Sequence, residues 1–156
     1  MAEFILLGYR LQVDVPGNRA YYAAHPLPWV SCGCAGCRNF VQAVKRLPQP
    51  VKAFFDTLGL DPEKPGEVCQ YGGTRNTISG SSWYFLSGQI LEGGPRPGGN
   101  EVYGEWVDLA EEFSAAFKPE CDLLPEDFPR PCFQMELNDL LPWVLDEPNP
   151  YEEDNC

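Results

Sequence analysis

The chain has 156 residues, of which 44% are hydrophobic and 13% aromatic, and its net charge at pH 7 is −12. That length matches one ordinary domain, and the many large apolar side chains argue against a disordered protein. The charge is concentrated in residues 81–156, which hold three Lys and Arg against seventeen Asp and Glu. Such a surface repels phosphate groups, so it disfavours direct binding to nucleic acid or to a membrane.

The first half of the chain shows a strand pattern followed by helix patterns. Residues 4–15 alternate between apolar and polar side chains, which predicts one half-buried strand. Asn18 is the expected N-cap of the first helix, and Gly59 is the expected stop of the last one. The three predicted helices cover residues 18–25, 37–48 and 50–58.

The second half is dominated by strand patterns separated by glycine and proline. Strands are predicted at residues 83–91, 102–109, 113–117 and 132–137. The loop at 92–100, rich in Gly and Pro, is expected to connect two of them as a mobile hairpin loop. We therefore predict one α+β domain over residues 1–145, with an N-terminal strand and two to three helices packed on a mainly antiparallel sheet. Residues 146–156 are expected to form an acidic, flexible tail.

The N-terminal sequence favours a cytoplasmic protein. The longest early apolar run follows the acidic Glu3 and is too short for a signal peptide or a membrane span. In a reducing cytoplasm, the seven cysteines favour a metal site, a redox pair or plain burial over a framework of disulfide bonds.

Three of the cysteines are clustered in the stretch WVSCGCAGCRNF, as Cys32, Cys34 and Cys37. Zinc prefers thiolate and imidazole ligands, and sulfur atoms from one tight turn can converge on one ion. Gly33 and Gly36 lack a Cβ atom and would allow the unusual backbone angles that such a turn requires. Cys37 would begin a helix, whose unpaired N–H groups stabilise a thiolate. The cluster therefore predicts a zinc site with three cysteine ligands.

A closed zinc site needs a fourth ligand. His25 is the nearest candidate and the only histidine of the chain. Cys69, Cys121 and Cys132 are alternatives from the part of the chain that is predicted to form the sheet. If water takes the fourth position, the ion becomes an open Lewis acid that can lower the pKa of that water to about 7.

Two other interpretations of the cluster remain open. Cys34 and Cys37 have the spacing of a redox-active dithiol at the start of a helix. Alternatively, the three cysteines are simply small residues in a turn. No phosphate-binding loop, G-x-S-x-G, H-E-x-x-H or dinucleotide-binding glycine motif is present in the sequence.

The motifs carry two resemblances. CGCAGCRNF, LPQPVKAFFDTLGLDPEKPGEV and LLPWVL together resemble an uncharacterised family of small acidic bacterial proteins over most of the chain. That resemblance implies a compact α+β domain built around the cysteine turn, without an assigned activity. Locally, CGCAGCR is similar to the zinc-binding segment of glutathione-dependent formaldehyde-activating enzymes. This second resemblance implies that Cys32, Cys34 and Cys37 act as one metal tripod.

The leading functional interpretation is a structural zinc protein without enzymatic activity, whose acidic half contacts a protein partner. One alternative is an enzyme that uses a reactive thiol or an open zinc ion at Cys32, Cys34 and Cys37. Another is an acidic inhibitor or nucleic-acid mimic that binds a basic protein.

Overall fold

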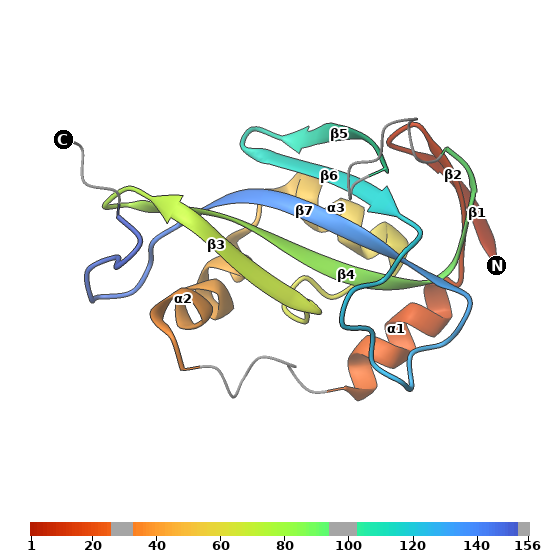
Figure 1. Ribbon diagram of the computed structural model, residues 1–156, viewed down its shortest axis with the longest axis horizontal. Helices are drawn as coiled ribbons and strands as arrows, with labels where there is room; N and C mark the ends of the chain where they lie inside the picture. Colours follow the sequence, from red (N-terminus) through yellow and green to blue (C-terminus); the bar gives the residue numbers. More distant parts are fainter. Residues whose placement is uncertain (26–32, 94–102, 153–156) are drawn as a thin grey trace.

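One antiparallel sheet organises the fold. The computed structural model describes residues 1–25, 33–93 and 103–152, and there seven strands are arranged in the order β1-β2-β4-β7-β6-β5, with β3 paired to β4 (Figure 1). The α+β fold class and the mainly antiparallel sheet are therefore confirmed. The strands are β1 (Ala2–Leu6), β2 (Tyr9–Val13), β3 (Glu67–Gly73), β4 (Thr77–Glu92), β5 (Tyr103–Ala110), β6 (Phe113–Lys118) and β7 (Cys132–Pro142). The helices are α1 (Val15–Ala24), α2 (Ala35–Ala43), the short 3₁₀-helix η1 (Val44–Arg46) and α3 (Gln49–Leu58).

The long strand β4 joins the two ends of the sheet. One of its edges pairs with β7 over residues 77–87, while its other edge pairs first with β3 and then with β2. The change of partner ends at Gly88, where φ is 137°. A Cβ atom at Gly88 would lie 1.9 Å from the carbonyl oxygen of Gln12, so the backbones approach too closely there for any side chain.

The N-terminal segment is a hairpin, so the prediction of one strand over residues 4–15 was wrong. Leu7 and Gly8 separate β1 from β2, and both have left-handed backbone angles, with φ of 55° and 79°. Two consecutive residues of this kind form the tight turn that matches the twist of a two-stranded hairpin. Leu7 is apolar and leucine rarely occupies such a position. The apolar pattern therefore continued through the turn, and nothing in it indicated a break.

Helix α1 begins earlier than predicted, and Asn18 is not its N-cap. Asp14 caps the helix instead, and its carboxylate accepts a hydrogen bond from the N–H of Gly17 at 3.0 Å. Asn18 lies inside the helix and is completely buried. Its amide donates to the carbonyl oxygen of Leu58 at 2.9 Å and accepts from the N–H of Ser87 at 2.9 Å, so it joins α1 to α3 and β4.

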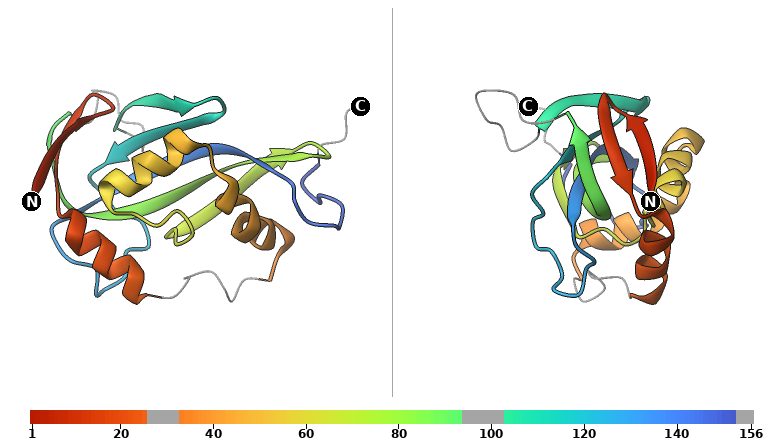
Figure 2. Two further views of the ribbon diagram at one scale, coloured as in Figure 1. Left: turned by 180° about the vertical axis from the view of Figure 1, so that it is seen from behind. Right: turned by 90° about the vertical axis from the view of Figure 1, so that its right-hand side faces the viewer.

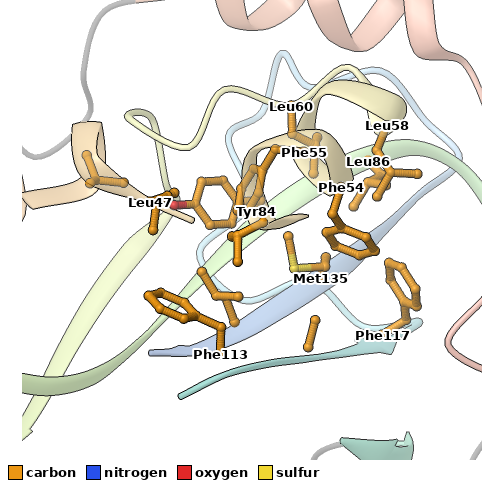
Figure 3. Close-up of a cluster of buried hydrophobic side chains, with 14 of the residues drawn as sticks. Leu47, Phe54, Phe55, Leu58, Leu60, Tyr84, Leu86, Phe113, Phe117 and Met135 are labelled. Carbon is orange, nitrogen blue, oxygen red and sulfur yellow. The ribbon is translucent and has the colours of Figure 1, made fainter. Parts of the chain in front are cut away.

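Helix α3 covers the core face of the sheet (Figure 2). The helix predicted at 50–58 is confirmed, and Gly59 ends it in a left-handed conformation with φ of 76°. Its buried face packs on aromatic residues of the sheet (Figure 3), with the ring centroids of Phe55 and Tyr84 4.7 Å apart. Phe54 and Phe117 make a second such contact at 6.3 Å. The buried residues of α3 are Val51, Phe54, Phe55 and Leu58.

Helix α2 is fastened to the end of β7 by Asn39. This side chain is completely buried, donates to the carbonyl oxygen of Pro142 at 3.1 Å and accepts from the N–H of Val144 at 2.7 Å. The helix predicted from residue 37 is thus present, although it begins at Ala35 and its last turn, η1, is a 3₁₀-helix. Asn39 fixes how the first turn of α2 lies relative to the sheet.

The first residues of the acidic segment 146–156 contact the β3–β4 turn. Asn149 is 5% exposed and donates to the carbonyl oxygens of Thr74 and Thr77, at 3.0 Å each. Glu152 forms an isolated bridge with Gly73. The remaining residues of this segment, and most of the predicted loop at 92–100, lie outside the described residues. Within the described ranges, no helix is long and apolar enough to span a membrane.

Candidate functional site

Two of the three clustered cysteines lie at the first turn of α2. Cys34 is the exposed N-cap residue, and its Sγ accepts a hydrogen bond from the N–H of Cys37 at 3.4 Å. Cys37 is buried. Both residues therefore stand where unpaired helix N–H groups stabilise a thiolate. Cys32, the third member of the predicted tripod, lies outside the described residues.

The glycines of the cysteine stretch have a different role from the one we expected. Neither Gly33 nor Gly36 has a left-handed backbone angle. Gly36 lies inside α2, and a Cβ atom there would be 2.8 Å from the side chain of Gln70 and 2.9 Å from the hydroxyl of Tyr151. Gly36 thus lies where α2 packs closely on side chains of β3 and of the C-terminal segment.

Arg38 links the start of α2, where Cys34 and Cys37 lie, to the segment that follows β7. We call this start of α2 the cysteine turn. Its Nε donates to the carbonyl oxygen of Gly33 at 3.1 Å, and its guanidinium group pairs with the carboxylate of Glu147. The guanidinium is also near enough to Cys34 for their charges to interact. A cation beside the turn favours a thiolate over a thiol.

His25 is engaged in a separate interaction. Its Nδ1 lies 2.7 Å from the carbonyl oxygen of Tyr21, and its Nε2 lies 2.6 Å from the carboxylate of Asp127. The carbonyl oxygen and the carboxylate both accept hydrogen bonds, which favours the doubly protonated ring over the neutral one. The hydrogen bond to Asp127 raises the pKa of His25, and the same contact lowers the pKa of Asp127.

A metal ligand needs a neutral imidazole nitrogen with a free lone pair. His25 would therefore have to give up either Tyr21 or Asp127 before it could bind a metal. Among the residues that the structure describes, no three His, Cys, Asp or Glu side chains lie close enough together to hold an ion. The assignment of His25 as the fourth ligand stays a prediction.

The other three described cysteines lie on the sheet and on the loop before β7. Cys121 and Cys132 are half-buried, with their sulfur atoms 3.8 Å apart. Burial, followed by the neighbouring Cys132, raises the pKa of Cys121 to about 12. Cys69 lies on β3, where burial also raises its pKa. Cys121 and Cys132 therefore lie side by side at the base of the loop 119–131, and burial keeps Cys121 a neutral thiol at neutral pH.

Oxidised glutathione is expected to link Cys121 to Cys132. Each sulfur gives up one proton and one electron, and the glutathione disulfide is reduced to two thiols. Because the high pKa of Cys121 makes it a weak nucleophile, the reaction should be slow at neutral pH. The disulfide would close a loop between two residues that are 11 positions apart. This should raise the free energy of unfolding by about 3 kcal/mol. Mass spectrometry of the crosslinked peptide and urea unfolding would measure both effects.

The Cys132→Ser variant is the control for this reaction, because it retains every other cysteine. It should show neither the crosslink nor the added stability. If the crosslinked protein unfolded at the same urea concentration as the reduced protein, the predicted effect on the loop would be wrong.

A buried carboxyl group lies beneath α2. Asp139, on β7, is 8% exposed and borders a small cavity that Gly36 and Asn39 also line. The described part of the chain provides no hydrogen bond to this carboxyl group. Burial raises the pKa of Asp139 to about 7. The sequence analysis did not identify this group.

The sheet face opposite the helices carries a polar groove. Trp83 pairs in register with Glu136, and both point away from the core because their neighbours Tyr84 and Met135 are buried in it. Lys118 is 6% exposed, with its Nζ 2.5 Å from Asp122 and 3.5 Å from Glu136. The residues that line the groove include Trp83, Glu136, Lys118, Asp122, Tyr71, Cys69 and Glu120.

The fold and the site together define a single-domain α+β protein with a cysteine turn at a helix N-terminus. A comparison with protein-family models gives no match, and neither the curated proteins nor the solved structures contain a match to this chain.

Proposed function

We propose that this is a small cytoplasmic zinc protein in which Cys32, Cys34 and Cys37 bind one structural zinc ion. The ion would hold the start of α2, and the protein would act by contact with a protein partner rather than by catalysis. The observation that supports this best is the shared turn of Cys34 and Cys37, linked by an N–H···S hydrogen bond of 3.4 Å. Zinc sites are commonly built from cysteines at such short spacings.

Elemental analysis tests the proposal directly. Protein purified without a metal-affinity step should contain about one zinc ion per chain, and a chelator should lower its thermal midpoint. The double variant Cys34→Ser/Cys37→Ser should lose the zinc. Cys156→Ser makes the same chemical change outside the proposed ligand set and should retain it. Metal-free wild-type protein with undiminished stability would contradict the proposal.

The fourth ligand can be identified by the His25→Gln variant. Loss of zinc from this variant would assign the fourth position to His25, which would then have left Asp127. Retention of zinc would assign it to water or to one of the cysteines Cys69, Cys121 and Cys132. Four protein ligands are typical of a structural ion, whereas three ligands and a water are typical of a catalytic one.

A thiol-dependent enzyme is the second candidate. It is favoured by the exposure of Cys34 at the N-cap while Cys37 is buried three residues later. An attacking thiol must be accessible, whereas its resolving partner is often shielded. Alkylation with iodoacetamide distinguishes the two candidates, since rapid modification of Cys34 in zinc-loaded protein would favour the enzyme.

The polar groove supports a basic protein as the partner, since it holds three carboxylates against one lysine, Lys118, which pairs with two of them. Glu120, Asp122 and Glu136 lie beside the indole ring of Trp83, and the whole chain has a net charge of −12. Carboxylates next to an aromatic ring are suited to Lys or Arg side chains. An acidic inhibitor of a basic protein would use the same surface.

A further inference from the structure

An aromatic cavity opens beside α1. We call it the α1 cavity. Neither Cys34 nor Cys37 lines it, whereas His25, the candidate fourth zinc ligand, does. Its volume is about 120 Å³, which is of the size of an apolar cavity that takes a single aromatic ring. Its lining includes Tyr21, Tyr22, His25, Lys64, Phe85 and Leu123.

The apolar wall of the α1 cavity is fixed by internal contacts. The hydroxyl of Tyr22 donates to the carbonyl oxygen of Phe85 at 2.7 Å and accepts from the N–H of Phe85 at 3.0 Å. Gly66 allows the turn before β3 to lie against this wall, since a Cβ atom there would be 2.7 Å from the ring of Phe85. The polar atoms of the wall are thus satisfied, and its rings are held in place for a ligand.

The charge inside the α1 cavity is opposite to that of the protein. None of the described residues that line it is acidic, and Lys64 is positively charged, whereas His25 is already paired with the carboxylate of Asp127. The Lys64 ammonium donates to the carbonyl oxygen of Tyr22, and an ammonium group has three donors. Within the described ranges no second hydrogen bond uses this ammonium group, so two of its donors are available to an anion on a chain with a net charge of −12.

The mouth of the α1 cavity carries an apolar residue in a strained conformation. Leu123 has a φ of 60° and is 71% exposed. A left-handed backbone angle at a residue other than glycine costs on the order of 1–3 kcal/mol and is found at ligand-binding sites. A ligand in the cavity would bury part of this leucine side chain.

We propose that the α1 cavity binds an aromatic monocarboxylate. The aromatic ring packs against Tyr22 and Phe85, the carboxylate binds the Lys64 ammonium group, and Leu123 contacts the ring at the mouth. Neutral or cationic compounds with the same ring lack the charge that pairs with Lys64, so they bind more weakly.

Calorimetric titration with phenylacetate tests this proposal, with phenylacetamide and phenethylamine as the neutral and cationic analogues. Wild-type protein should bind phenylacetate about tenfold more tightly than either analogue, which corresponds to one charge-assisted hydrogen bond. Lys64→Gln should remove this preference, and Lys64→Arg should retain it. Lys52→Gln, which removes an exposed lysine of α3, should bind like the wild type.

The apolar contact is tested separately by Leu123→Ser. This variant should weaken phenylacetate and phenylacetamide by the same factor, because it leaves Lys64 in place. The thermal midpoint of each variant shows that it is folded. The proposal is overturned if folded wild-type protein binds none of the three compounds, if it binds all three equally, or if Lys64→Gln binds phenylacetate as Lys52→Gln does.

Discussion

Replacing Asp139 with asparagine is expected to stabilise the protein at pH 8 and to have little effect at pH 4. Burial raises the pKa of Asp139 to about 7 from an ordinary value of 3.8. Between these two values the unfolded chain has lost the proton and the folded chain has kept it. Raising the pH through this window therefore favours unfolding. Asparagine has the same shape and does not ionise, so the variant should gain about 4 kcal/mol between pH 4 and pH 8 relative to the wild type.

Urea unfolding at several pH values measures this difference. Glu111→Gln, at an exposed carboxyl group on the β5–β6 turn, provides the control and should follow the wild-type pH profile. An Asp139→Asn profile parallel to that of the wild type would show that Asp139 is already ionised in the folded protein.

The Asn18→Ala variant is expected to lose about 4 kcal/mol of folding free energy. Its side chain satisfies two buried backbone groups, the carbonyl of Leu58 and the N–H of Ser87. Alanine can pair with neither of them, and each unsatisfied buried group costs about 1–3 kcal/mol. The loss should appear as a lower midpoint in urea with an unchanged slope.

Asn76→Ala is the matched control for this loss. Asn76 is exposed, and its recorded hydrogen bonds use only its backbone. Its replacement should change stability by less than about 0.5 kcal/mol. Equal effects of the two substitutions would mean that Asn18 does not join α1 to the sheet.

The elements with clear local signals were predicted well. Helix α3 has apolar residues three and four positions apart and a glycine immediately after it, and its bounds differ from the prediction by one residue. The β1–β2 hairpin was missed because Leu7 is apolar and its left-handed conformation is unusual for leucine. Asn and Asp side chains both cap helices, so the local sequence did not decide whether Asn18 or Asp14 is the N-cap of α1. Asn18 instead binds Leu58 and Ser87, which are 40 and 69 residues away in the sequence.

The site shows the same division between local and distant signals. The position of Cys34 and Cys37 at a helix start follows from their own neighbourhood and agrees with the structure. The ion pair of His25 with Asp127 joins residues 102 positions apart, and no spacing rule indicates it. Asp139, in contrast, was detectable, because it continues the alternation of buried residues along β7. The apolar members of that series are Phe133, Met135, Leu137 and Leu141.

The position of β7 has a consequence for synthesis on the ribosome. This strand lies between β4 and β6, yet it is the last strand of the sheet to be made. Until residue 142 has emerged, one edge of β4 and one edge of β6 have unpaired backbone groups. Exposed strand edges attract other chains, and pairing between distant segments is slow. The nascent chain therefore has to avoid association with other chains until β7, the strand between β4 and β6, has been synthesised. A ribosome that stalls before Cys132 releases a chain that is prone to aggregate.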